Sequence, residues 1–120
     1  MQRTHLLYTL MLFIFTHGLD SCSKKSNPNI ELSYYEDGTI KTLTVNKVDK
    51  SLYTVFSFDK TGGIDSIENK KDSLRYGQSL WFNENGMLQN SAIFKDGKHN
   101  GQAFMFYDDG SIKNHRNWTN

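Results

Sequence analysis

Acidic residues, histidines and serines are the side chains of this sequence that could do chemistry, and their spacing favours no catalytic or metal centre. Two acidic pairs precede glycines, in Glu36-Asp37-Gly38 and Asp108-Asp109-Gly110. Calcium needs roughly six to eight oxygen ligands from a spaced set, whereas Asp in a turn accepts local backbone hydrogen bonds. No serine stands in a Gly-x-Ser-x-Gly motif, and the histidines lack metal-ligand spacing. We therefore expect no metal, no cofactor and no enzyme activity.

The N-terminal segment has the composition of an export signal. Arg3 and His5 precede an apolar run over residues 6–15, and a polar stretch follows up to the only cysteine, Cys22. This order of charged, apolar and polar parts is typical of a secretory signal peptide. The apolar run is about ten residues long, against roughly 20 for a helix that spans a bilayer. A retained transmembrane anchor is therefore the weaker alternative.

Cys22 is the residue for which the sequence predicts covalent chemistry. The tetrapeptide Leu19-Asp20-Ser21-Cys22 resembles a bacterial lipobox, in which the cysteine becomes the diacylated first residue; Asp20 is unusual there. A single exported cysteine forms no internal disulfide. We expect residues 1–21 to be a lipoprotein signal peptide, and residues 22–29 to be the lipidated Cys22 and a polar tether. The expected location is the bacterial cell envelope, periplasmic or surface-facing. A plain signal peptide and a fortuitous cysteine are the alternatives.

The remainder of the chain is a tandem repeat with a period of 24 residues. Glycines mark the period, with an apolar residue two places after each and two apolar or aromatic residues four and six places before it. The glycines are Gly38, Gly62, Gly86 and Gly110, and the three columns are Ile40, Ile64, Leu88 and Ile112; Tyr34, Phe58, Phe82 and Phe106; and Leu32, Phe56, Leu80 and Phe104. Because side chains alternate faces along a strand, an even period places each column on one face of a sheet.

Each repeat is predicted to be one β-hairpin, with a glycine turn that requires a positive φ. A second turn is expected at Lys95-Asp96-Gly97-Lys98. Residues 30–120 should then form four repeats of about 24 residues in an all-β fold, an elongated single antiparallel sheet of tandem hairpins preceded by a signal helix. The columns should form its core. Apolar residues at odd positions, such as Leu43 and Ile67, indicate a bulge that switches the phase, and residues 66–73 are polar enough to predict a mobile loop.

The opposite face carries residues that are typical of binding surfaces. Tyr, Trp and Met are enriched in interface cores. We predict a binding face of Tyr35, Trp81, Ile93, Met105 and Tyr107. The alternative is that this face packs against the tether or a curled part of the sheet. The last strand has no obvious cap, so an edge-strand homodimer is also plausible.

The repeat units resemble those of MORN repeat variant proteins. The resemblance rests on Tyr76-Gly77-Gln78-Ser79-Leu80-Trp81-Phe82-Asn83-Glu84-Asn85-Gly86 and on Phe94-Lys95-Asp96-Gly97-Lys98-His99-Asn100-Gly101, and it is good over residues 76–118. The second repeat departs at Thr61-Gly62-Gly63. The resemblance implies an elongated sheet, a binding role and no family-wide catalytic residues. Proteins of this kind, small bacterial lipoproteins among them, are often grouped with YwqK-family antitoxins, which implies a toxin as partner.

Composition is consistent with one domain, and the only kind of partner that it argues against is nucleic acid. The 120 residues include 37% hydrophobic and 13% aromatic residues, and the net charge is +1. Without a basic stripe, we expect no nucleic acid partner. The sequence therefore predicts an exported, lipid-anchored, non-enzymatic protein that binds a macromolecule at the cell envelope. Toxin neutralisation and binding of glycan or cell wall are the alternatives.

Overall fold

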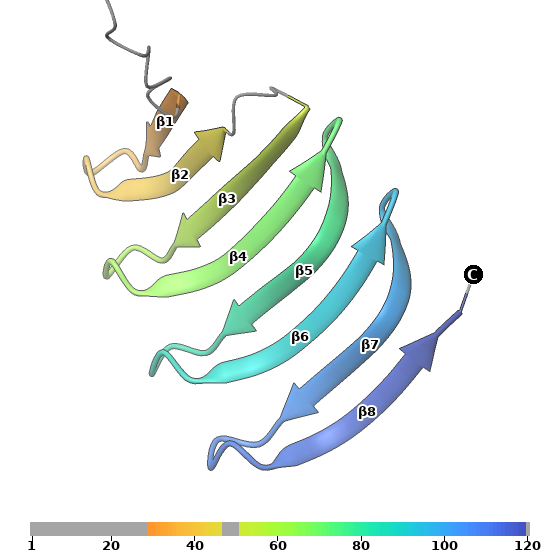
Figure 1. The fold of residues 1–120 in the computed structure, drawn as a ribbon. Coiled ribbons are helices and arrows are strands. Elements are labelled where there is room, and N and C mark those ends of the chain that lie inside the picture. The colour runs from red at the N-terminus through yellow and green to blue at the C-terminus, as the bar shows by residue number, and fades with distance from the viewer. Residues whose placement is uncertain (1–28, 47–50, 120) are drawn as a thin grey trace, which may run out of the picture.

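The protein is one open sheet of eight antiparallel strands, joined in sequence order as consecutive hairpins (Figure 1). The computed structural model describes residues 29–46 and 51–119. The strands are β1 (Asn29–Tyr34), β2 (Ile40–Asn46), β3 (Leu52–Phe58), β4 (Ile64–Lys71), β5 (Leu74–Phe82), β6 (Leu88–Lys95), β7 (Lys98–Phe106) and β8 (Ile112–Trp118). The predicted all-β sheet is confirmed, and its first strand begins one residue earlier than expected.

The expectations for the N-terminal segment lie outside the described residues. They include the signal helix, the lipid on Cys22 and most of the tether. Among the residues that the structure describes, no helix is long and apolar enough to cross a membrane.

The four repeat glycines close the hairpins as predicted. Their φ values are 86°, 88°, 75° and 82°, in the left-handed region that favours glycine. In each turn the glycine N–H donates to the carbonyl three residues earlier, at 2.9–3.1 Å. The acceptors are Tyr35, Asp59, Asn83 and Tyr107. The geometry of the second repeat is therefore regular, despite its Thr61-Gly62-Gly63 sequence.

A side-chain oxygen accepts hydrogen bonds within each glycine turn, but the outer two repeats supply it from one position and the middle two from another. In the first and last repeats, Asp37 and Asp109 accept from the N–H and hydroxyl of Thr39 and Ser111. In the middle repeats the acceptor lies two residues earlier. Asp59 accepts from Thr61 and Gly63, and Asn83 accepts from Asn85 and Met87. These local bonds account for the acidic turns without any metal ion.

Two of the connections at the opposite ends of the hairpins are two-residue turns. Asp96-Gly97 joins β6 to β7, with φ values of 50° and 80°, and Asp72-Ser73 joins β4 to β5, with 49° and 70°. Positive φ at both central residues defines the type I′ turn, whose twist matches that of the strands. The expected loop over residues 66–73 is wrong, because residues 64–71 form β4 and pair with both neighbours. Its polar side chains reflect a sheet that is open to solvent on both faces.

A bulge beside each glycine turn switches the phase of the following strand. The pairing shifts at Ser33/Tyr34, Ser57/Phe58, Trp81/Phe82 and Met105/Phe106. Leu43 and Ile67, at odd positions, therefore pair with Phe56 on the same face as the even-numbered columns. We call this side of the sheet the apolar face. In the third repeat Ser91 takes that place between Leu80 and Phe104.

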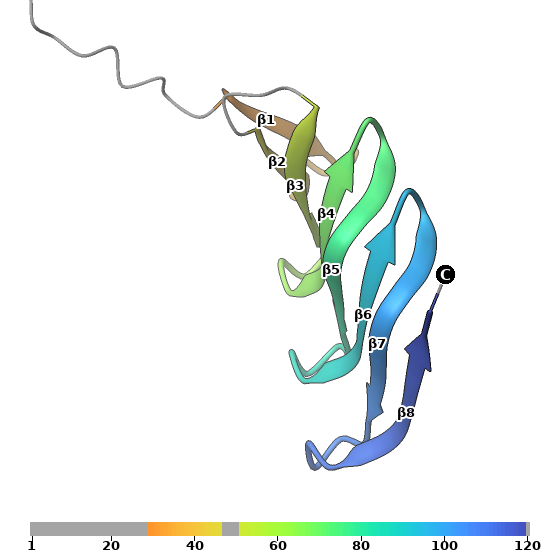
Figure 2. The ribbon, with the colours of Figure 1, turned by 45° about the vertical axis from the view of Figure 1, so that its right-hand side comes forward.

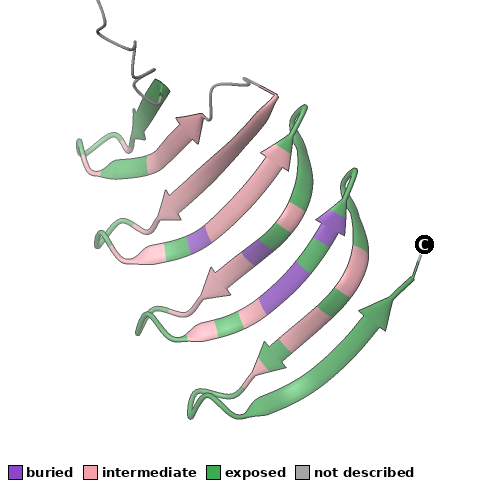
Figure 3. Cartoon of the chain, in the orientation of Figure 1, coloured by how far each residue is buried: buried purple, intermediate pink, exposed green. Residues whose placement is uncertain are grey.

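The sheet is a single layer, and its column residues are half-buried or exposed (Figures 2 and 3). Ala92 and Phe94 are the only buried apolar residues in the described part of the chain, at 4% and 5% exposure. Both come from β6 and lie on the face opposite the columns, because Ala92 pairs with Ser79 and Ala103. The expectation that the columns form the core is therefore corrected, because no second layer covers them in this part of the chain.

Candidate binding face

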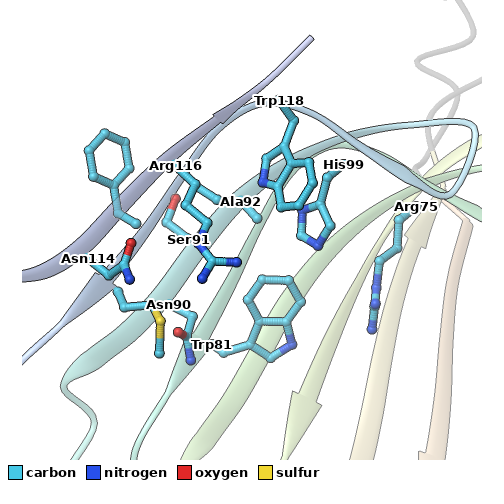
Figure 4. A pocket seen from close by; sticks show the side chains of 12 residues that line it. Arg75, Trp81, Asn90, Ser91, Ala92, His99, Asn114, Arg116 and Trp118 are labelled. Carbon is cyan, nitrogen blue, oxygen red and sulfur yellow. The ribbon is translucent and has the colours of Figure 1, made fainter. Parts of the chain in front are cut away.

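A hollow of about 530 Å³ lies over β5 to β8, on the face opposite the apolar face (Figure 4). We call it the trough. The residues whose side chains lie on this face and line it are Arg75, Trp81, Asn90, Ala92, His99, Ala103, Met105, Asn114, Arg116 and Trp118. Ser91 and Phe104 also border it, although their pairing places their side chains on the apolar face.

Small side chains form the floor of the trough because they pair across three central strands. Ser79 lies opposite Ala92, and Ala92 lies opposite Ala103. On one side of this floor the paired row contains Trp81, Asn90, Met105 and Asn114. On the other side Phe94 pairs with His99. The contrast between small floor residues and large flanking residues creates the hollow.

Glycines at irregular positions in β5 and β7 shape the upper wall. Gly77 and Gly101 have φ values of 78° and 115°, and they lie where the pairing of β4 with β5 and of β6 with β7 shifts. Beyond the shifts, Arg75 pairs with Lys70 and His99 with Phe94. A Cβ on Gly101 would lie 3.4 Å from Ile93 of the apolar face, so glycine at this position also permits close packing between β6 and β7.

A chain of aromatic contacts crosses the trough from β5 to β8. Trp81 meets Phe94 edge to face, with ring centres 6.1 Å apart. Phe94 contacts His99 at 4.5 Å, and His99 stacks on Trp118 at 5.4 Å. Aromatic pairs of this kind contribute roughly 0.5 to 1.5 kcal/mol beyond their buried area. The chain therefore stiffens the sheet, and it leaves Trp118 42% exposed at the open end.

Arg75 forms part of the trough wall on the β4 side, and its charge is compensated by an ion pair with Glu68. Its Nε and Nη2 donate to Glu68 Oε1 at 3.0 and 2.7 Å. Its guanidinium carbon also lies 5.4 Å from the ring centres of Trp81 and Phe94. Ser79 on the same face is fully buried, and its Oγ has no hydrogen-bond partner. These contacts position Trp81 and close the trough toward β4.

The polar groups of the trough that remain available are Arg116, Asn90 and Asn114. Within the described residues their side chains make no hydrogen bond or ion pair, and Arg116 pairs with Ala103 at the β8 side of the floor. No carboxylate is among the lining residues. The trough therefore offers one guanidinium without an ion pair and two amides without hydrogen bonds beside aromatic surfaces, a combination suited to binding.

The structure brings together only part of the predicted binding face. Trp81 and Met105 lie in one row of the trough, as expected. Ile93 lies on the apolar face, because the bulge at Trp81/Phe82 reverses the phase of β6, and this placement corrects the expectation. Tyr35 and Tyr107 follow β1 and β7 in glycine turns and are not among the lining residues.

Sequence reasoning missed the residues that complete the trough. Phe94, His99, Arg116 and Trp118 were not grouped with Trp81. Leu43 and Ile67 mark the bulges of the first two repeats, whereas the equivalent residue of the third repeat is the polar Ser91, which gives no such signal. The sequence offered one signal of this different arrangement. Around Phe94 and Gly101, β6 and β7 depart from the pattern of apolar residues seen in β2 and β4.

Two further observations bear on the class of site. Among residues 29–46 and 51–119, no cluster of three or more His, Cys, Asp or Glu side chains could hold a metal ion. No known family matches the chain, and no curated protein is significantly similar to it.

Proposed function

We propose that the chain is an exported, lipid-anchored binding protein of the bacterial cell envelope, which holds a macromolecular partner in the trough without transforming it. The trough carries this proposal, because it combines aromatic walls with the side chains of Arg116, Asn90 and Asn114, which make no hydrogen bond or ion pair within the described residues. Clusters of Trp and Arg dominate the energetics of most binding surfaces. The predicted export signal and Cys22 provide the location.

The chemistry of the trough favours an anionic partner that also presents a ring or an apolar side chain. Arg116 offers a guanidinium that can bind a carboxylate or phosphate in two-point fashion. Trp118, 42% exposed, offers a flat surface for stacking, and the amides of Asn90 and Asn114 can both donate and accept hydrogen bonds. A toxin surface and an acidic envelope glycan both satisfy these requirements.

Binding is tested with Arg116→Ala and Trp118→Ala, using Lys60→Ala as a matched control that removes an exposed cation from a glycine turn. The readouts are retention on purified peptidoglycan and in-cell cross-linking to envelope proteins. We expect each trough variant to weaken binding by at least about tenfold, as for a binding hot spot, and the control to bind normally. Retention on peptidoglycan alone would identify a glycan partner. Equal binding by all four proteins would refute the trough as the site.

The anchor is tested separately by intact mass and membrane fractionation of the wild type and of Cys22→Ala. Loss of residues 1–21 with an added acyl mass on Cys22, and release of Cys22→Ala from the membrane fraction, are the expected results. An unprocessed chain, or a cleaved chain without lipid, would contradict the anchor and leave a protein that binds through the trough.

A further inference from the structure

The apolar face is continuous across all eight strands. The pairing aligns one central row directly from strand to strand: Leu32, Leu43, Phe56, Ile67, Leu80, Ser91, Phe104 and His115. Beside the glycine turns a second row consists of the pairs Tyr34 and Ile40, Phe58 and Ile64, Phe82 and Leu88, and Phe106 and Ile112. A third row consists of three paired groups, with a shift of register between one group and the next: Ile30, Val45, Thr54 and Asn69; Gln78 and Ile93; and Gln102 and Asn117.

None of these three rows contains an Asp, Glu, Lys or Arg. His115 is the one basic side chain in them, and it stacks on Phe104 with the rings 4.5 Å apart and 9° from parallel. The other face carries the charged residues Glu68, Lys70, Arg75 and Arg116 among its central rows. Lys41 and Lys113, at the bulges, reach toward Tyr35 and Tyr107 in the turns. The three rows are therefore free of acidic residues, lysine and arginine, and the charges on this side of the sheet, Lys71, Lys95 and Lys98, lie beyond the third row beside the two-residue turns.

This face is left open to solvent. Ile30, Tyr34 and Ile112 are 58%, 55% and 59% exposed. A soluble monomer rarely exposes a continuous apolar patch larger than a few hundred Å². Domains are built from at least two packed layers, whereas the described residues provide one. A second layer must come from elsewhere.

We propose that the second layer is a second copy of this chain, packed apolar face against apolar face as a two-sheet sandwich. Eight strands at about 4.8 Å and three rows of side chains give a face of roughly 38 by 20 Å. Two such faces bury about 1,500 Å², within the range of stable, specific interfaces. The three rows carry no Asp, Glu, Lys or Arg, so they meet their own copy without like-charge repulsion, while Lys71, Lys95 and Lys98 lie at the margin of the face. Facing sheets stack about 10 Å apart with strands nearly aligned. In this dimer both troughs point outward and remain open.

The test compares two variants, Ile93→Lys and Met105→Lys, whose parent side chains are similarly exposed. Ile93 on the apolar face is 40% exposed, and Met105 in the trough is 44% exposed. Each is changed to Lys in the full chain carrying Cys22→Ala, and molar mass is measured by light scattering over micromolar concentrations. We expect the parent and Met105→Lys to be dimers, and Ile93→Lys to raise the dissociation constant by at least about tenfold. Far-UV circular dichroism confirms that each variant remains folded.

Three outcomes would overturn the proposal. The first is a monomeric parent at every concentration, including one that binds only to lipid vesicles. The second is a dimer that Met105→Lys disrupts as strongly as Ile93→Lys. The third is a dimer that survives Ile93→Lys but is lost with Asn114→Pro in β8, which indicates pairing of edge strands. Ile93→Lys tests the apolar face and Met105→Lys tests the trough. Failure of the proposed dimer is therefore distinguishable from failure of the binding function proposed for the trough.

Discussion

At the scale of single residues, the glycine turns depend on ionised carboxylates. Hydrogen bonds from Thr39, Thr61 and Ser111 hold the pKa values of Asp37, Asp59 and Asp109 below the usual value for aspartate. A group with a lowered pKa in the folded state stabilises the fold above its unfolded pKa. That contribution is lost as the pH falls through the lowered value. Asn83 accepts the equivalent bonds without a charge.

We therefore predict that Asp59→Asn reduces the dependence of stability on acid. Asn keeps a side-chain oxygen for Thr61 and Gly63, as Asn83 does for Asn85 and Met87, but it does not titrate. The thermal midpoint of the wild type should fall as the pH is lowered from neutral to about 2, and the fall should be smaller in the variant. Asp65→Asn, which changes a strand carboxylate without a hydrogen bond in the described residues, is the control for the loss of one negative charge. An unchanged slope in Asp59→Asn would contradict the turn assignment.

Among the connecting elements, two turns can be compared directly: Asp72-Ser73 between β4 and β5, and Asp96-Gly97 between β6 and β7. Ser73 and Gly97 occupy equivalent positions 24 residues apart, with φ values of 70° and 80°. A residue with a Cβ is disfavoured in this left-handed conformation by roughly 1 to 2 kcal/mol, and glycine is not. The first of these turns is therefore under backbone strain that the second avoids.

We predict that Ser73→Gly raises the free energy of unfolding by about 1 kcal/mol and that Gly97→Ser lowers it by a similar amount. A Cβ at position 97 would lie 3.5 Å from Leu74, an ordinary contact, so the change tests the backbone alone. Chemical denaturation of the two variants beside the wild type measures both effects. Changes of the same sign in the two variants would argue against a shared type I′ geometry.

At the scale of the whole molecule, stability is expected to decline from the middle of the sheet toward its ends. In a repeat array each unit leans on its neighbours, and the end strands have only one. Every residue of β1 and β8 is exposed, whereas Ser91, Ala92 and Phe94 of β6 are buried. The trough contacts reinforce the C-terminal half, where Trp118 ties β8 to His99.

Native-state hydrogen exchange should follow this gradient. We predict the strongest amide protection in β5 and β6, weaker protection in β7 and β8, and the weakest in β1 and β2. Trp118→Ala should lower protection in β8 more than in β2, because the stack on His99 is lost. Uniform protection across all eight strands would show that the sheet opens only as one cooperative unit, against the repeat description.

The period, the glycine turns and most of the strands were predictable from the sequence, because glycines with positive φ and apolar columns repeat locally and need no distant partner. Gly38, Gly62, Gly86 and Gly110 and the Asp96-Gly97 turn were predictable for this reason. The polar strand β4 and its Asp72-Ser73 turn were not, because they lack that pattern. The tertiary structure alone decided which side chains share a face. Each bulge adds one residue to a strand and reverses the alternation, so Ile93 moved to the apolar face, while Phe94, His99 and Trp118 joined Trp81. The trough exists only in the register between strands, which no single strand encodes.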